Sequence, residues 1–181
     1  MRFGAGLGLG IVIGVLLGFV VASYLPIPTH VTNVTAATHG VKWGEEGAYA
    51  IYAVSGHALF IPVTGGEVLI YCHNGKYYIR TSMLGEVKVG TSDRLDFKEV
   101  LKYLGISPTE VVKEGEMKIP TKWGIRNAIV FKAKDPTKGY IMEIAIDKET
   151  GIILYITAHS IKKEMGGAAL SIELKETNTL P

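Results

Sequence analysis

From Trp43 onward, short apolar runs alternate with turn sequences, which is the pattern of consecutive antiparallel strands. Asn74-Gly75 separates two such runs, residues 68–73 and 76–81, and is a strong hairpin signal because both central residues of a type I′ turn need positive φ. Thr64-Gly65-Gly66 is a second turn composition, and we expect it to join an earlier strand, residues 57–63, to this hairpin. The pattern therefore predicts a run of three antiparallel strands.

Four further strand-like runs follow, at residues 125–134, 140–147, 152–162 and 169–176. The segments between them are rich in Gly, Pro, Asp and Thr, which are turn residues. Some runs are apolar at consecutive positions, notably Val68 to Tyr71 and Ile152 to Ile156, whereas a strand with one buried face would alternate. We therefore expect the central strands to be covered on both faces.

Two helices are expected between these groups of strands. The main one has four apolar residues at helical spacing: Phe97, Val100, Leu101 and Leu104. Ser107-Pro108-Thr109-Glu110 then has the arrangement of a capping box with Pro at the first helical position, which predicts a short second helix to about Lys113. The predicted fold class is α+β and β-dominated, with a strongly curved, half-barrel-like antiparallel sheet, one main helix and one short helix.

The N-terminal residues 4–25 carry no charge and are largely apolar. At about 1.5 Å per residue they would form a helix of roughly 33 Å, which is enough to cross a hydrocarbon core of about 30 Å. Arg2 is the one charged side chain before Lys42, so the positive-inside rule places the N-terminus in the cytoplasm. We expect a transmembrane signal anchor at residues 1–25, a stalk at 26–42 and an extracytoplasmic domain at 43–181. The alternative is secretion after cleavage behind Ala22.

Small residues recur on one side of this predicted helix. Gly6, Gly10, Gly14 and Gly18 are spaced by four, and such stripes let helix backbones approach closely in lipid. They predict a homo-oligomer that associates through the glycine stripe, although glycine is also common in membrane helices in general. No window satisfies GxGxxG, which excludes a dinucleotide-binding loop.

The expected stalk is uncharged as far as Gly40 and begins Pro-Ile-Pro. Its threonines at positions 29, 32, 35 and 38 repeat every three residues, the period of an extended polyproline II segment. Asn33-Val34-Thr35 is a sequon, so an exported chain could carry an N-linked glycan at Asn33. The alternative for residues 31–38 is a first β-strand of the domain, because the segment is rich in β-branched residues.

Composition excludes several classes of protein. The 19 basic and 17 acidic residues give a net charge of +2 and are interspersed, so no basic stripe exists for nucleic acid. The single cysteine, Cys72, excludes a disulfide-rich scaffold, and we expect it to be buried, with an intermolecular disulfide as the alternative. No catalytic or metal-binding motif is present, so we expect no cofactor and no enzymatic activity.

Two late segments of the chain resemble a known family. Residues 120–130 and 140–154, with the hairpin phrase Asp147-Lys148-Glu149-Thr150-Gly151, look like the late strands of curved-sheet domains related to the bacterial lipoprotein carriers LolA and LppX. Similar segments occur in exported archaeal proteins. The resemblance implies a bent antiparallel sheet that wraps around a helix and can enclose acyl chains, and it transfers no binding residue.

Together these features predict a membrane-anchored, extracytoplasmic, non-enzymatic domain that binds an apolar ligand, such as a lipid or acyl chain, or a partner protein. The alternative is a structural subunit of a cell-envelope layer or filament. An enclosed, charge-free apolar pocket would favour the binding domain, and an unpaired edge strand or a groove complementary to the N-terminal segment would favour the structural subunit. An enzyme would require ionisable residues clustered in a cleft.

Overall fold

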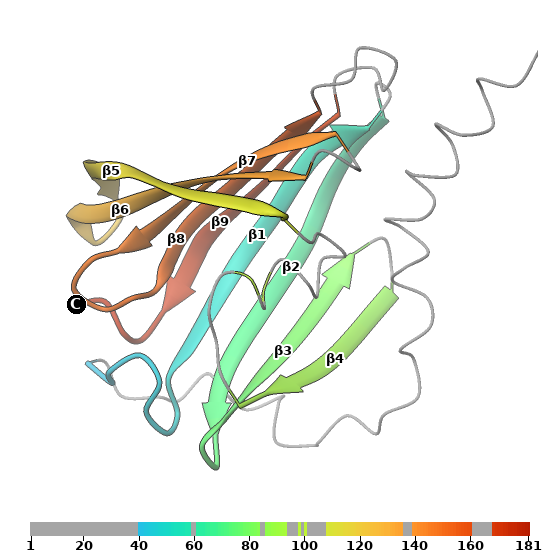
Figure 1. Cartoon of the computed structure of the whole chain (residues 1–181). Coiled ribbons are helices and arrows are strands. Elements are labelled where there is room, and N and C mark those ends of the chain that lie inside the picture. The colour runs from blue at the N-terminus through green and yellow to red at the C-terminus, as the bar shows by residue number, and fades with distance from the viewer. Residues whose placement is uncertain are drawn as a thin grey trace, which may run out of the picture.

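The computed structural model describes residues 40–58, 61–83, 86–93, 98, 100, 108–135, 139–160 and 168–181. These residues form nine strands of one antiparallel sheet, which is twisted and curved (Figure 1). The strands are β1 (Tyr49–Ala58), β2 (Ile61–His73), β3 (Lys76–Met83), β4 (Glu86–Ser92), β5 (Glu110–Thr121), β6 (Gly124–Asp135), β7 (Tyr140–Asp147), β8 (Ile153–Ser160) and β9 (Ala169–Thr177).

The order of strands across the sheet is β4-β3-β2-β1-β9-β8-β7-β6-β5. The chain starts in the middle with β1, moves outward to the edge strand β4, and reaches the other edge at β5. It then returns strand by strand until β9 pairs with β1 (Figure 1). The first and last described strands are therefore neighbours at the centre, and the two edges are β4 and β5.

Both faces of the sheet carry apolar clusters, as the consecutive apolar positions predicted. Residues paired across strands share a face, and one face, here called the core face, carries the largest cluster, which includes Tyr52, Ile70, Met142, Ile144, Ile156 and Ile172. Val100, between β4 and β5 in the chain, packs into that cluster. On the second face, Tyr49, Leu69 and Tyr71 form a smaller cluster, in which Tyr71 stacks on Tyr78 with 4.9 Å between ring centroids.

The predicted Asn74-Gly75 hairpin is confirmed, with φ of 50° at Asn74 and 70° at Gly75. The turn predicted at Thr64-Gly65-Gly66 is wrong, because these residues continue β2. They lie at a β-bulge, where the pairing changes from Val54 with Gly66 to Gly56 with Val63. A glycine with positive φ, here Gly65 at 77°, serves a bulge as well as a turn, so the composition was ambiguous.

The predicted α+β fold class is wrong, because the described residues form one β-sheet with turns and include no complete helix; only Lys98 and Val100 among them have helical conformation. The expected short second helix is the start of β5, where Val111 and Val112 pair with Ala133 and Lys132. β-branched residues favour strands, and the pairing with β6 outweighs the local capping signal. Of the expected main helix, only Lys98 and Val100 are described.

The expected transmembrane helix at residues 4–25 lies outside the described residues. No helix of the described ranges is long and apolar enough to cross a membrane. The curved antiparallel sheet that the resemblance to LolA and LppX implies is present, and of a helix that such a sheet would wrap only Lys98 and Val100 are described.

The C-terminal tail hydrogen bonds to the segment that leads into β1. The Asn178 side chain, fully buried, accepts a hydrogen bond from the Tyr49 backbone N–H (2.9 Å) and donates one to the Gly47 carbonyl (3.0 Å). The Asn178 carbonyl also accepts from the Gly40 N–H at 2.9 Å. Thr177 adds a hydrogen bond from its hydroxyl to the Tyr49 carbonyl at 2.6 Å. The two ends of the described chain therefore stabilise each other.

Candidate functional site

A groove of about 610 Å³ lies between the β5–β6 turn and the strands β8 and β9. Its floor is the second face of the sheet, where Glu143 pairs with Thr157 and Tyr155 pairs with Glu173. The lining residues are Ile119, Pro120, Thr121, Lys122, Trp123, Glu143, Leu154, Tyr155, Thr157, Glu173, Leu174 and Lys175.

Two β-bulges open this part of the sheet. Between β7 and β8 the pairing passes from Ala145–Tyr155 to Ile146–Ile153, which leaves Leu154 as an extra residue. Between β1 and β9 it passes from Ile51–Glu176 to Tyr52–Leu174, which leaves Lys175 as an extra residue. The pairing of β8 with β9 ends at Tyr155 and Glu173, although β9 continues to Thr177. Because bulges bend strands and redirect side chains, the two strands separate here and the groove forms.

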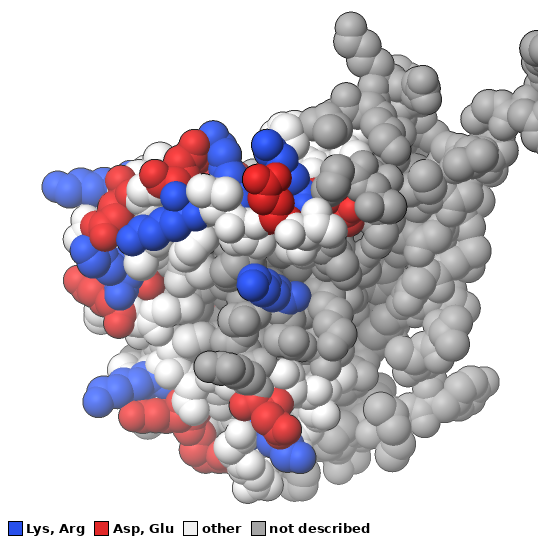
Figure 2. All heavy atoms as spheres, in the orientation of Figure 1, with Lys and Arg blue, Asp and Glu red and all other residues white. Residues whose placement is uncertain are grey.

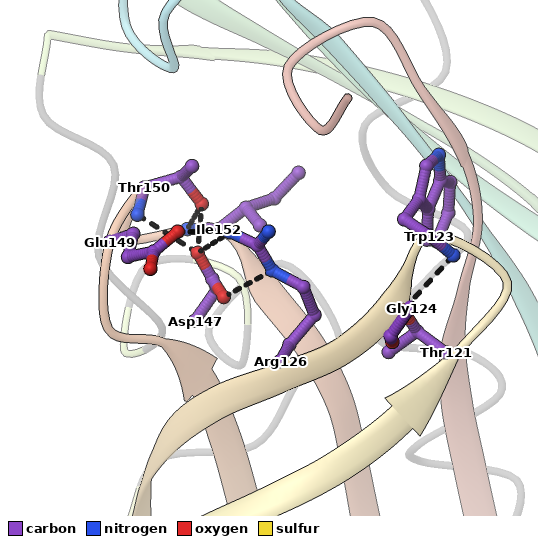
Figure 3. A network of polar contacts seen from close by, with 8 residues as sticks. All are labelled: Thr121, Trp123, Gly124, Arg126, Asp147, Glu149, Thr150 and Ile152. Atoms are coloured by element: carbon purple, nitrogen blue, oxygen red, sulfur yellow. Dashed lines mark hydrogen bonds and ion pairs between the residues drawn. The ribbon is translucent and has the colours of Figure 1, made fainter.

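The turn between β5 and β6 forms the other wall of the groove. The Thr121 hydroxyl accepts a hydrogen bond from the Trp123 backbone N–H (3.1 Å) and donates to the Gly124 carbonyl (2.8 Å), which fixes the turn (Figure 3). Trp123 is partly buried against the core cluster. The Lys122 ammonium lies 4.6 Å from the centre of the Trp123 ring, within cation–π range. This wall therefore presents an aromatic surface with a cation beside it.

Tyr155 and Glu143 form the polar centre of the floor. The Tyr155 hydroxyl donates to Glu143 Oε1 at 2.6 Å and lies 3.9 Å from the Met117 sulfur on β5. Burial, together with the hydrogen bond to Glu143, raises the pKa of Tyr155 to about 12. The phenol therefore stays protonated at physiological pH and acts as a hydrogen-bond donor rather than as a base.

The remaining chemistry of the groove suits binding. Glu173 accepts a hydrogen bond from the Ser171 hydroxyl at 2.8 Å, and Lys175 adds a second cation to the lining. The described residues that line the groove include no histidine or cysteine. Within the described ranges, no group of three or more His, Cys, Asp or Glu residues is placed to hold a metal ion. The groove thus offers aromatic, apolar and oppositely charged surface without an evident nucleophile or metal centre.

A buried ion pair supports the β6 and β7 strands next to the groove (Figure 3). Arg126 donates to both carboxylate oxygens of Asp147, at 2.9 and 3.0 Å, and to Glu149 at 2.8 Å. Thr150 donates to Asp147 through its hydroxyl and its backbone N–H. Burial alone would raise the pKa of Asp147, but the hydrogen bonds from Arg126 and Thr150 outweigh it and lower the pKa. Arg126 Nε and Nη2 and both donors of Thr150 have acceptors within this cluster, which is the arrangement of a structural ion pair.

Acidic and basic side chains are intermixed over the β5–β6 hairpin, at the left of Figure 2. Two ion pairs here are exposed. Lys132 with Glu114 (2.5 Å) lies within the hairpin, and Lys148 with Glu116 (2.8 Å) joins the hairpin to the turn between β7 and β8. The three exposed large apolar side chains of the described residues, Val112, Met117 and Ile125, lie on the same hairpin. The hairpin therefore combines exposed apolar and charged side chains on one surface.

Few of the residues proposed from sequence can be compared with the structure. Gly6, Gly10, Gly14, Gly18 and Asn33 all lie outside the described residues. Cys72 is buried, as predicted, and burial raises the pKa of its thiol to about 11. The side chain of its neighbour His73 hydrogen bonds to Glu46 at the surface, with 2.5 Å between His73 Nδ1 and Glu46 Oε1. Sequence reasoning missed the groove residues, because the bulges that assemble them leave no recognisable pattern.

No protein-family model matches the sequence, and a search of the curated proteins finds no match. Among solved structures, a chain of the crystal structure of MucB in complex with MucA(peri) is 16% identical, with a TM-score of 0.41, over 72% of this chain and 50% of that one. The complex structure of Pseudomonas aeruginosa MucA/MucB gives 16% identity and a TM-score of 0.40, over 71% and 51%. This chain therefore spans about half the length of these two chains.

A DUF1329 family protein from Desulfovibrio piger is 9% identical, with a TM-score of 0.25, over 90% of this chain and 92% of that chain. All three TM-scores lie below 0.5. The likeness is too distant to identify a shared function or a shared binding residue.

Proposed function

We propose that this chain is a non-enzymatic binding domain whose groove, between the β5–β6 turn and the split of β8 and β9, receives a segment of a partner protein. The mixed lining of this open groove supports the proposal: Trp123 and Ile119 offer apolar surface, and Lys122 and Glu173 offer charges of both signs. A polypeptide presents the same mixture, because its backbone is polar and its side chains differ in character.

An acyl chain fits this groove less well. Binding of hydrocarbon would remove water from Glu143, Glu173 and Lys175 without offering them a hydrogen-bond partner, which is costly. The feature expected for a lipid site is an enclosed, charge-free apolar cavity, and this groove is open and charged. A lipid ligand is therefore the alternative that the experiment has to test.

The location of the domain is part of the proposal. The apolar residues 4–25 and the single preceding charge at Arg2 support an anchor in the cell membrane, with the N-terminus in the cytoplasm and the domain outside. Secretion after cleavage behind Ala22 gives the same compartment without the anchor. In either case the groove meets extracytoplasmic partners, and Asn33 is available as a glycan acceptor.

The test uses the full-length chain in detergent and a phage-displayed library of short random peptides. Enriched peptides are synthesised with a fluorophore, and their affinity is measured by fluorescence anisotropy. Trp123→Ala should weaken binding by about tenfold or more, because aromatic anchors dominate interfaces of this kind. Lys76→Ala is the matched control, since Lys76 begins β3, in the other half of the sheet, and faces Asp93 at 3.8 Å.

A fluorescent fatty acid is measured in parallel. If it binds with an affinity that Trp123→Ala reduces, and no peptide is enriched, the groove is a lipid site and the proposal is wrong. If peptides bind but Trp123→Ala and Lys76→Ala behave alike, binding occurs elsewhere and the groove has been assigned wrongly.

A further inference from the structure

The edge strand β5 has two properties of an interaction surface. Among the described strands it pairs with β6 alone, and the backbone groups along its other side have no partner in any of these strands. Its side chains are also exposed, including two large apolar ones, Val112 at 55% and Met117 at 47%. An unpaired strand edge of this kind is a template for pairing with another chain.

A β-bulge in the middle of β5 determines which residues share a face. Lys113 pairs with Phe131 and Gly115 pairs with Val130, so Glu114 is the extra residue. Val112 and Met117 pair with Lys132 and Ala128 of β6, and both therefore lie on the second face of the sheet. Lys113 and Glu116 pair with Phe131 and Ile129, and both lie on the core face. Without the bulge, residues five apart, such as Val112 and Met117, would lie on opposite faces.

We propose that β5 pairs antiparallel with β5 of a second copy of this chain, around a two-fold axis between Glu114 and Gly115. In this register Val112 lies opposite the partner's Met117, and Lys113 lies opposite the partner's Glu116. Two-fold symmetry repeats each pair. The exposed apolar side chains then cover each other on one face, and two pairs of opposite charge form on the other.

The bulge selects this register. With the axis between Glu114 and Gly115, the two bulges meet, and the residues from 110 to 119 oppose partners on the same face throughout. An axis at Met117 would give a shorter match, from Gly115 to Ile119. At one end the bulge reverses the faces beyond Gly115, and at the other end Pro120 has no N–H to donate. An axis at Lys118 would place that lysine against its own copy, which is repulsive.

Charges, a bulge and a proline are also the features by which edge strands avoid pairing. Charges of one sign along an edge strand would repel a second copy of that strand most strongly. β5 instead carries Lys113 and Lys118 together with Glu114 and Glu116, and Lys113 and Glu116 become complementary under two-fold symmetry. A pair of strands buries less surface than the roughly 1,200–2,000 Å² of a standard interface, so the dimer is expected to be weak.

The test is a charge swap in the full-length chain, with association measured by sedimentation equilibrium in detergent. Lys113→Glu and Glu116→Lys each place two like-charged pairs across the axis, and each should weaken association by about tenfold or more. An equimolar mixture of the two variants restores opposite charges at every pair. It should associate within about threefold of the unmodified chain. Glu116→Lys also breaks the Glu116–Lys148 ion pair, and this pair stays broken in the mixture. Recovery of association in the mixture therefore shows that both variants are folded and that loss of this ion pair does not cause the weakening.

Lys118→Glu is the matched control, because Lys118 would lie opposite the partner's Val111. If this variant weakens association and Lys113→Glu does not, the axis lies at Met117 and the proposed register is wrong. If the unmodified chain does not associate, or if the mixture associates no better than its components, β5 is not a dimer interface. Association through the N-terminal glycines would be equal in every variant and would show no charge dependence.

Discussion

Arg126 on β6 and Asp147 at the end of β7 form a two-pronged ion pair, with Nε to Oδ1 at 2.9 Å and Nη2 to Oδ2 at 3.0 Å. The Asp147 side chain is 1% exposed, and Thr150 adds two more hydrogen bonds to it. One carboxylate thus joins the start of β6 to the turn between β7 and β8. Because that turn leads into the β8 bulge at Leu154, the pair also supports the floor of the groove.

Asp147→Asn should destabilise the fold by about 2–3 kcal/mol at pH 7, because it leaves the Arg126 charge largely buried without its counter-charge. The folded-state pKa of Asp147 is below its ordinary value, so the ion pair is fully present above about pH 5 and is lost as pH falls through that lowered pKa. The difference between variant and unmodified chain should therefore shrink in acid. Urea unfolding at pH 7 and at pH 3 measures it.

The control for this prediction is Glu149→Gln. Glu149 also accepts a hydrogen bond from Arg126, but its side chain is 67% exposed, so its loss should have little effect at either pH. Equal destabilisation by both substitutions, or a pH-independent effect of Asp147→Asn, would show that the carboxylate charge of Asp147 does not stabilise the fold.

Asn178→Ala should destabilise the domain by about 3 kcal/mol. The substitution leaves the buried Tyr49 N–H without a partner, which costs about 1–3 kcal/mol, and it also removes the partly buried hydrogen bond to the Gly47 carbonyl, worth about 1 kcal/mol. Thermal unfolding followed by circular dichroism measures the loss. Lys175→Ala, in the same strand region but exposed, is the comparison, and a similar change in both variants would mean that the Asn178 contacts contribute little.

The later strands were predictable from sequence because their patterns agree with their surroundings. The prediction for residues 140–147 matches β7, and Asn74-Gly75 could be identified because positive φ at two successive residues restricts the amino acids. The start of β5 was not predictable in this way. Pro108 and Glu110 give a helix-start signal, and the pairing with β6 that overrides it is a contact between residues more than 20 positions apart.

The groove could not be predicted at all. It depends on Leu154 and Lys175, which are extra residues in two separate strands, and on the fact that β8 and β9 stop pairing after Tyr155 and Glu173. Neither bulge contains a glycine or another residue that demands an unusual backbone conformation. A bulge of this kind results from the fit between three strands, so single-strand periodicity does not reveal it.

Cys72 should react slowly with thiol reagents in the folded protein. Burial raises the pKa of its thiol to about 11, so at pH 8 very little of it is the reactive thiolate. The modification rate with iodoacetamide, read by intact mass, should rise steadily from pH 7 toward pH 10. Because Cys72 is the only cysteine, the assay needs no second substitution. The same chain in urea is the reference, and equally fast labelling in both states would contradict burial of Cys72.

A close approach of the β9 backbone to Gly56 of β1 allows a final prediction, on the pairing of β1 with β9. A Cβ added to Gly56 would lie 2.2 Å from the Ala169 carbonyl oxygen, and a backbone atom cannot move aside as a side chain can. Gly56→Ala should therefore cost about 2 kcal/mol or more in the free energy of unfolding. Gly115→Ala is the matched control, since its Cβ meets nothing within 4 Å and should change stability by less than about 1 kcal/mol. Urea unfolding of both variants decides it, and equal stability would show that β9 does not pack against β1 at Gly56.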